Sequence, residues 1–228
     1  MISVLTLTYK RHHLLEEAIQ SFLFQEIDNN LTEMVIINDN PEVDYVFDNN
    51  SNVRIINHKQ RFSSISAKIE WGYKQCKNEY IYRLDDDDLL TPWALGNVKT
   101  DIENNPGYDV YRSKGMYFFS ENKYEGRGGS TNNGNVYTKS YLDRIKFPDM
   151  SFGEDSELTF GNNSKIYESK LKDTMIYRWG MGTLHISGMG KQSNETVLAQ
   201  ADKVLDNTKG TIELHPHFKN NYYNMLPK

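Results

Sequence analysis

The amino-acid sequence predicts an α/β fold built on a Rossmann-like, mostly parallel central sheet flanked by helices. Through residues 1–100, short apolar runs rich in β-branched residues alternate with segments whose apolar residues recur at helical spacing. Such alternation requires crossover connections, which place the strands parallel. The chain has 228 residues, enough for one sizeable domain. Its 38% hydrophobic residues exclude a disordered chain.

The first part of the chain predicts four buried strands and three helices. The strands are short, apolar on both faces and bounded by polar residues, as parallel strands are. We place them at Ile2–Thr8, Met34–Ile37, Val53–Ile56 and Glu79–Leu84. Helical spacing of apolar residues indicates helices at His12–Glu26, from Ile65 to Cys76, and after Thr91-Pro92, where threonine caps and proline fits the first turn.

The second part predicts further strands, two short helices and one irregular segment. Strands are expected at Tyr108–Arg112, Gly115–Phe119, Asn135–Thr138, Met175–Trp179 and Thr183–Ile186. Short helices are expected at Ser140–Ile145 and Ser156–Phe160, and a last helix after a cap at Ser193. Glu125–Asn135 is so rich in glycine and asparagine that it predicts a mobile loop without regular structure. His215–Lys228 carries no clear pattern.

Composition excludes several functional classes. The net charge of −5 argues against a nucleic-acid partner. A single cysteine, Cys76, excludes an internal disulfide and a cysteine-based zinc cage. The opening residues lack the basic and apolar regions of a signal peptide, and no apolar run approaches the ~20 residues of a transmembrane segment. We therefore expect a soluble, cytoplasmic protein.

Polar residues follow three of the predicted strands at the point where each strand ends. They are Thr8-Tyr9-Lys10-Arg11, Asn38-Asp39-Asn40 and Asp85–Asp88. In parallel α/β sheets, ligands bind beyond the carboxyl ends of the strands. These three groups are therefore expected to gather along one edge of the sheet and form a site.

The four consecutive aspartates predict either a cation site or a solvated turn. Adjacent carboxylates repel one another, so holding them in one turn is costly without a cation. Their hard oxygens suit Mn²⁺ or Mg²⁺, which typically bridge one or two carboxylates to a diphosphate. Taken alone, the run fits an acidic turn capping the next helix equally well. The buried strand before it and Leu89-Leu90 after it favour the metal site, and the spacing excludes an EF-hand.

Four motifs together resemble family 2 of the inverting glycosyltransferases, which have the GT-A fold. ISVLTLTYKR is similar to the family's opening strand and turn, and MVIINDN to its second strand. EYIYRLDDDDLLTP resembles its Asp-x-Asp metal motif, and FGEDSEL the motif that carries its catalytic base. Their order agrees over roughly residues 1–190. Three positions depart from the family pattern, at Lys10, Asn38 and Leu7.

The resemblance implies a donor site for a nucleotide-diphosphate sugar, with UDP as the expected nucleotide. Thr8, Tyr9 and Arg11 would contact the base and ribose, and Asp39 would accept a hydrogen bond from a base N–H. Asp85 or Asp86 would face the ribose.

The resemblance also implies the metal and the base. Asp87 would bind Mn²⁺ or Mg²⁺, and Lys68 would reach the base or the phosphates. His185 stands where some members carry a metal or phosphate ligand, although a structural hydrogen bond explains it equally well. Asp155 would be the catalytic base, with Glu154 as the second candidate. The helix expected after them would favour their ionised forms.

A metal site together with a carboxylate base is consistent with glycosyl transfer with inversion. The metal would neutralise the leaving diphosphate, and a carboxylate would take the proton of the acceptor hydroxyl. On this interpretation residues 1–100 form the nucleotide-sugar half, residues 101–190 the half that binds a carbohydrate acceptor, and residues 191–228 a C-terminal helix and tail.

Three other functions remain open. A glycoside hydrolase also uses two carboxylates, but it needs no nucleotide pocket. A sugar-1-phosphate nucleotidyltransferase usually opens with a glycine-rich basic loop, which Thr8–Arg11 lacks. A non-catalytic module that binds nucleotide sugars or carbohydrates would keep the same pocket without turnover.

Overall fold

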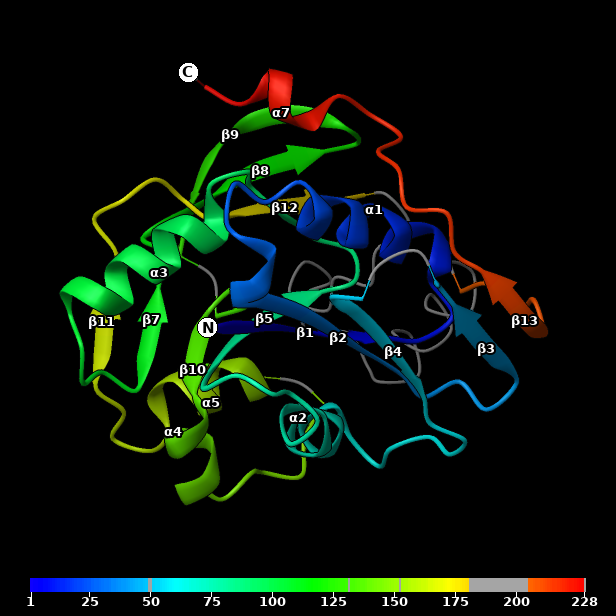
Figure 1. Cartoon of the computed structure of the whole chain (residues 1–228), viewed down its shortest axis with the longest axis horizontal. Helices are drawn as coiled ribbons and strands as arrows, with labels where there is room; N and C mark the ends of the chain where they lie inside the picture. The colour runs from blue at the N-terminus through cyan, green and yellow to red at the C-terminus, as the bar shows by residue number, and fades with distance from the viewer. Residues whose placement is uncertain (49–50, 131, 152, 181–204, 228) are drawn as a thin grey trace.

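The computed structural model describes residues 1–48, 51–130, 132–151, 153–180 and 205–227. A seven-stranded sheet with the strand order β11-β7-β10-β5-β1-β2-β4 forms the centre of the fold (Figure 1). Four of its strands, all from the first part of the chain, pair in parallel. They are β1 (Ile2–Thr8), β2 (Thr32–Asn38), β4 (Val53–Asn57) and β5 (Tyr80–Asp85). The predicted first four strands are confirmed.

The other side of this sheet comes from the second part of the chain. There β10 (Val136–Thr138) runs antiparallel between β5 and β7 (Val110–Arg112). At the edge, β11 (Ile166–Glu168) pairs with β7 in parallel. The prediction of an α/β fold with a mostly parallel sheet is therefore confirmed.

Helices cover both faces of the sheet. One face carries α1 (His12–Leu23) and α3 (Ala94–Asn104). A short 3-10 helix, η1 (Asn29–Leu31), lies between α1 and β2 in the chain. The other face carries α2 (Ile65–Tyr73), α4 (Lys139–Arg144) and α5 (Glu154–Phe160) (Figure 1). The sheet is thus covered on both sides, and its central strands β1 and β2 are buried at every position.

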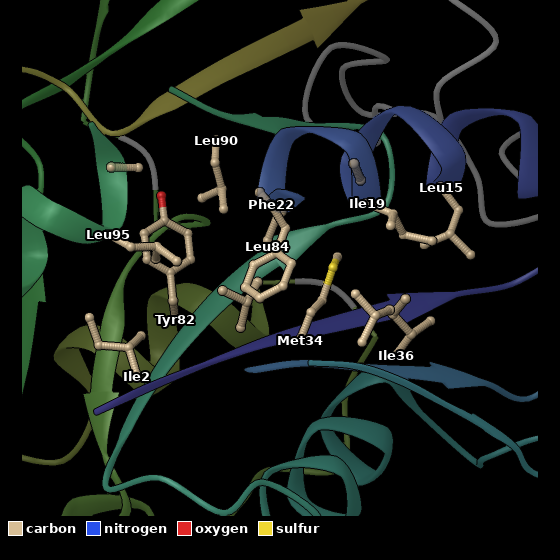
Figure 2. Packing of buried hydrophobic residues seen from close by; sticks show 14 of the residues in the cluster. Ile2, Leu15, Ile19, Phe22, Met34, Ile36, Tyr82, Leu84, Leu90 and Leu95 are labelled. Carbon is tan, nitrogen blue, oxygen red and sulfur yellow. The ribbon is translucent and has the colours of Figure 1, made fainter. Parts of the chain in front are cut away.

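The packing of α1 shows how the helical spacing creates this core. Leu15, Ile19 and Phe22 are spaced three or four residues apart, so they share one face of the helix. Figure 2 shows them pointing at the sheet, where Met34 and Ile36 of β2 lie. These residues are almost completely buried. Packing at this density anchors both the start of α1 and the end of β2, where the polar residues of interest follow.

A second sheet has four strands in the order β6-β12-β8-β9. It consists of β6 (Leu89–Leu90), β12 (Met175–Trp179), β8 (Gly115–Ser120) and β9 (Lys123–Gly129). β6 follows the aspartate run directly, and it pairs with β12 in an antiparallel arrangement. The second sheet therefore begins directly after the aspartate run.

The prediction of an irregular loop at Glu125–Asn135 is wrong for its first five residues, which lie in β9. The turn between β8 and β9 contains Glu121 and Asn122 with φ of 46° and 68°, the positive values of the tight hairpin turns that match strand twist. The backbones of the two strands approach closely here, since a Cβ on Gly115 of β8 would lie 2.7 Å from the carbonyl oxygen of Gly128. The composition indicated flexibility, whereas the hairpin uses the glycines for close approach.

The C-terminal segment returns along the outside of the molecule. Its strand β13 (Gly210–Glu213) pairs in parallel with β3 (Val43–Val46), and α7 (Tyr222–Met225) lies beside β9 (Figure 1). β3, β6, β11 and β13 are two to four residues long and were not predicted. None of the described helices has the length and apolar character that a bilayer crossing requires. The strand expected at Thr183–Ile186 and nearly all of the helix expected after Ser193 lie outside the described residues.

Candidate functional site

Three neighbouring strands end at the same edge of the seven-stranded sheet. In register, Thr8 of β1 pairs with Asn38 of β2, and Leu7 pairs with Asp85 of β5. The residues that follow each strand are therefore brought together, as the sequence predicted. The contacts below confirm this convergence for Thr8, Asp39 and Asp87.

Lys68 connects the ends of β1 and β2. Its Nζ lies 2.7 Å from the carbonyl oxygen of Thr8 and 2.5 Å from Asp39 Oδ1. Both side chains are buried, with 7% and 2% exposure. Burial lowers the pKa of Lys68 to about 8, and the negative charge of Asp39 opposes this shift. Lys68 is thus a fixed, buried partner of Asp39.

Asp39 has a second cationic partner, Arg61, which belongs to the segment between β4 and α2. Arg61 Nη1 lies 2.7 Å from Asp39 Oδ1, and the backbone N–H of Phe62 donates to Oδ2 at 3.1 Å. The Arg61 guanidinium also lies over the ring of Tyr9, 3.5 Å from its centroid. Tyr9, Asp39 and Arg61 therefore form one stacked, hydrogen-bonded group.

The turn after β1 has a constrained backbone. Lys10 has a φ of 56°, in the left-handed region that non-glycine residues rarely adopt. The C-terminal segment supports it, because the Asp206 N–H donates to the Lys10 carbonyl at 2.8 Å. Asp206 also pairs with His12 Nδ1 at 2.6 Å. This turn sets the directions of Tyr9 and Arg11.

Arg11 connects the turn after β1 to the aspartate run. Its Nε and Nη2 contact the two carboxylate oxygens of Asp86, the first at 3.3 Å, and its Nη1 lies 2.9 Å from Asp87 Oδ2. Asp86 is completely buried. Burial raises the pKa of Asp86 to about 6, and Arg11 opposes the shift. Asp86 therefore acts mainly as the partner of Arg11.

The other three aspartates have the arrangement of a cation site. Asp85, Asp87 and Asp88 each offer a carboxylate oxygen, and these oxygens lie within 4.8 Å of one another. Oxygens that share one Mg²⁺ lie up to about 4.2 Å apart, so these carboxylates are near the spacing that one cation requires. The residues present fit a divalent cation with hard oxygen ligands. Asp85 is the most accessible of the three, with a side chain 33% exposed.

Asp88 is the member of this group that the protein holds most tightly. Its Oδ2 accepts from Asn133 Nδ2 at 2.6 Å, and its Oδ1 accepts from the backbone N–H of Arg178 at 3.0 Å. Burial raises its pKa well above the ordinary value. Asp88 thus fixes the turn against the segment of Asn133 and against β12, whereas Asp87 contacts Arg11 at the surface of the site.

Arg178 of β12 supports the turn from behind. Its Nε donates to the Asp87 carbonyl at 2.5 Å, and its Nη1 lies 2.5 Å from Glu17 Oε2. Both side chains of this ion pair are completely buried. Glu17 also accepts the backbone N–H of Lys219 at 2.9 Å. The chain after β13 is therefore tied through Glu17 and Arg178 to the aspartate run.

Tyr222 of α7 completes this network through its hydroxyl group. We expect Tyr222→Phe to lower the free energy of unfolding by about 1 kcal/mol, because the substitution removes a hydrogen-bonding hydroxyl. Its hydroxyl donates to Asn122 Oδ1 at 3.1 Å and lies 3.4 Å from Arg178 Nη1. Urea unfolding measures the change. The control is Tyr124→Phe, on β9 beside the same apolar cluster. Equal losses in the two variants would show that the Tyr222 hydroxyl has no special role.

The two candidate bases lie at the start of α5. Gly153 precedes them with a φ of 75°, a left-handed conformation that glycine adopts without strain. Burial raises the pKa of Asp155 to about 8; Arg83 opposes the shift, and Asp85 adds to it. Burial also raises the pKa of Glu154. Burial therefore opposes the effect of the helix terminus on both carboxyl groups, and the expectation that the terminus favours their ionised forms stays a prediction.

The Asp155 carboxylate has one oxygen available to accept a hydrogen bond, and Arg83 is its cationic neighbour. Its Oδ1 is buried and has no hydrogen-bond partner among the described residues. Arg83 contacts Asp85 at 2.6 Å and has its charge close to Asp155. The candidate base and the first aspartate of the run therefore belong to one electrostatic unit, although 70 residues separate them in sequence.

Several residues of the site were not found from the sequence. Arg83 and Arg178 each stand within an apolar strand, and a charge there must be paired when buried, a signal that could have identified both. Arg61 and Asn133 lie outside regular structure and carry no such signal. His185, the other expected metal ligand, lies outside the described residues. The binding and catalytic roles assigned to the other residues stay predictions.

Comparison with known proteins gives a family match. A family model described as glycosyl transferase family 2 matches residues 3–162 of the chain. A search of curated proteins finds no match. Arg178 and the C-terminal segment lie beyond the matched range, so the family pattern does not account for their contacts with the aspartate run.

Solved structures with the same fold include TarS from S. aureus and a mannosyltransferase. TarS 1-349 has a TM-score of 0.64 and 18% identity over 78% of this chain and 60% of the TarS chain. Its complex with UDP-GlcNAc has a TM-score of 0.67 and 18% identity over 89% of this chain and 65% of TarS. PcManGT from Pyrobaculum calidifontis, in complex with GDP-Man and Mn²⁺, has a TM-score of 0.57 and 12% identity over 77% of this chain and 56% of PcManGT. This chain thus spans less than two thirds of each.

Proposed function

The chain belongs to glycosyl transferase family 2, and on that premise we propose that it transfers a sugar from a nucleotide-diphosphate sugar to an acceptor hydroxyl with inversion, in a metal-dependent reaction. The expected GT-A fold is confirmed by the likeness to TarS. The main observation that supports the proposal is a convergence at the carboxyl ends of adjacent parallel strands. The residues that meet there are Tyr9, Asp39, Asp85 and Asp87.

For the donor, we assign the nucleoside to the edge formed by Thr8, Tyr9 and Asp39. The Asp39 carboxylate would accept an in-plane N–H of the base, and the Tyr9 ring would stack on the base face. Lys68 keeps the Asp39 carboxylate in place. Asp85 is the more accessible candidate for the ribose, since both oxygens of Asp86 contact Arg11.

For the metal, we assign Asp87 as a ligand of Mn²⁺ or Mg²⁺, with Asp88 supporting the turn that carries it. A divalent cation here would neutralise the charge of the leaving diphosphate. PcManGT was solved with Mn²⁺, and its donor, like that of TarS, is a nucleotide-diphosphate sugar. The proposed donor of this chain is UDP-linked.

For catalysis, we assign Asp155 as the general base that takes the proton of the acceptor hydroxyl, with Glu154 as the second candidate. A base with a pKa near the working pH combines proton affinity with a usable ionised fraction. Burial moves the pKa of Asp155 in this direction, and a cation bound near Asp85 would favour the ionised form. Residues 1–100 would supply the donor half of the site and residues 101–190 the acceptor half, which takes a carbohydrate. A cytoplasmic location stays a prediction.

A thermal-shift screen of UDP, GDP, dTDP and CDP, each with and without Mn²⁺, tests the proposal. At 100 times its dissociation constant a ligand adds about 2.7 kcal/mol of stability. For a chain of this size that corresponds to a rise in Tm of roughly 5–10 °C. We expect the rise for at least one diphosphate, and only with Mn²⁺ present. No shift with any of the four would contradict the donor site.

Two of the alternatives predict different results in turnover assays. A glycoside hydrolase would cleave a simple glycoside without metal. A binding module would show the metal-dependent thermal shift but no consumption of UDP-sugars when a panel of carbohydrate acceptors is supplied. Release of UDP that depends on both Mn²⁺ and an acceptor is the result expected of a transferase.

A further inference from the structure

We propose that Arg61 is a built-in competitor for the nucleobase: its guanidinium occupies the Tyr9 ring face and the Asp39 carboxylate, and it must leave before a nucleotide binds. The inference rests on the proposed function, because it takes the base to bind Tyr9 and Asp39. It adds that the Arg61 guanidinium, a group of similar shape and chemistry, lies at the position proposed for the base.

The contacts of Arg61 are those that a base would make. Its planar guanidinium lies 3.5 Å from the centroid of the Tyr9 ring, and its Nη1 lies 2.7 Å from Asp39 Oδ1. Uracil and guanine also present a flat π-system with an N–H in its plane. One face of the Tyr9 ring can stack on only one such group at a time, and Asp39 Oδ1 already accepts from both Lys68 and Arg61. The guanidinium and the base therefore exclude each other.

Arg61 is also the partner of Asp39 that can leave at low cost. Its side chain is 52% exposed, whereas that of Lys68 is 7% exposed and also bound to the Thr8 carbonyl. When Arg61 leaves, Asp39 keeps Lys68 at Oδ1 and the Phe62 N–H at Oδ2. No buried charge is left without a partner, and the repulsion between the two cations is relieved.

The proposal predicts the sign of a mutational effect. If Arg61 competes with the base, Arg61→Ala tightens nucleotide binding. If Arg61 stays in place and clamps the base, the same substitution weakens binding. An ion pair with one half-exposed partner and a cation–π contact of the same side chain together set the expected gain at about 3- to 30-fold in affinity.

Calorimetric titration of UDP, GDP and CDP in the presence of Mn²⁺ measures this effect on the full chain. The matched control is Lys59→Ala, because Lys59 belongs to the same segment, is 66% exposed and pairs with Asp44 outside the group formed by Tyr9, Asp39 and Arg61. Lys59→Ala removes the same charge and so reports the lost attraction to the diphosphate. We expect Arg61→Ala to bind UDP or GDP about 3- to 30-fold more tightly than Lys59→Ala does.

CDP provides a control on the ligand side. Cytosine has an acceptor where uracil has its ring N–H, so it cannot replace the Arg61 bond in the same way, and its affinity should gain less. Arg61→Ala that binds UDP and GDP no more tightly than Lys59→Ala overturns the inference while leaving the proposed function intact. If neither the wild type nor Arg61→Ala binds any of the three diphosphates, the proposed function fails and the inference fails with it.

Discussion

Replacing Asp155 by asparagine is expected to lower the turnover rate by about 10²–10⁴-fold, the usual cost of removing a general base. Asparagine nearly preserves the shape of the side chain but cannot accept the acceptor proton. In the structure, Asp155 Oδ1 is a buried acceptor without a partner among the described residues. The substitution therefore breaks no hydrogen bond of this oxygen within the protein, and the loss should appear in the rate rather than in the fold.

The measurement is the turnover rate at saturating donor and acceptor, with thermal unfolding as a check on the fold. Glu157→Gln is the matched control, because Glu157 lies in the first turn of the same helix and is exposed. Nucleotide affinity should be unchanged, since the base contacts the acceptor. A loss of less than about fivefold, well below the expected range, would move the assignment to Glu154, and Glu154→Gln would then test it.

Replacing Asp87 by alanine is expected to abolish Mn²⁺-dependent nucleotide binding. The charge stabilisation that a bound metal supplies is worth several kcal/mol, which corresponds to a loss of at least about 100-fold in affinity. The variant should fold, because Arg11 keeps its contacts with both oxygens of Asp86. Arg178 binds the backbone carbonyl of residue 87 rather than its side chain.

Calorimetry with UDP, with and without Mn²⁺, checks this prediction. Asp88→Asn is the control, since an amide oxygen can still accept the Arg178 N–H and the Asn133 amide can rotate to match it. We expect Asp88→Asn to keep most of the metal-dependent affinity. Wild-type affinity in Asp87→Ala would refute the assignment of Asp87 as the metal ligand.

The convergence of the residues that follow β1, β2 and β5 could be predicted, because it depends only on patterns within short segments of the sequence. Each of β1, β2 and β5 is a short apolar run, and the polar residues that follow are read directly from the sequence. Parallel pairing then brings the ends together without further information. The expected convergence of Thr8, Asp39 and Asp87 is confirmed for this reason.

The different roles of the four aspartates could not be predicted from the sequence around them. They are chemically identical in sequence, yet Asp86 contacts Arg11, Asp88 contacts Asn133 and the Arg178 backbone, and Asp85 is partly exposed. Their roles follow from the direction in which the turn points each side chain. That direction depends on partners up to about 90 residues away, as the separation of Asp88 and Arg178 shows.

What the sequence by itself determined is the four parallel strands and three α-helices of residues 1–100 and the edge at which their polar residues meet, because periodicity and strand direction are local properties. Only the tertiary structure decided that Arg61 lies on Tyr9, that burial raises the pKa of Asp155, and that Arg178 supports the aspartate run. Each of these depends on which distant segments pack together. Burial and pairing of charges arise from that packing, and no pattern within a single segment records them.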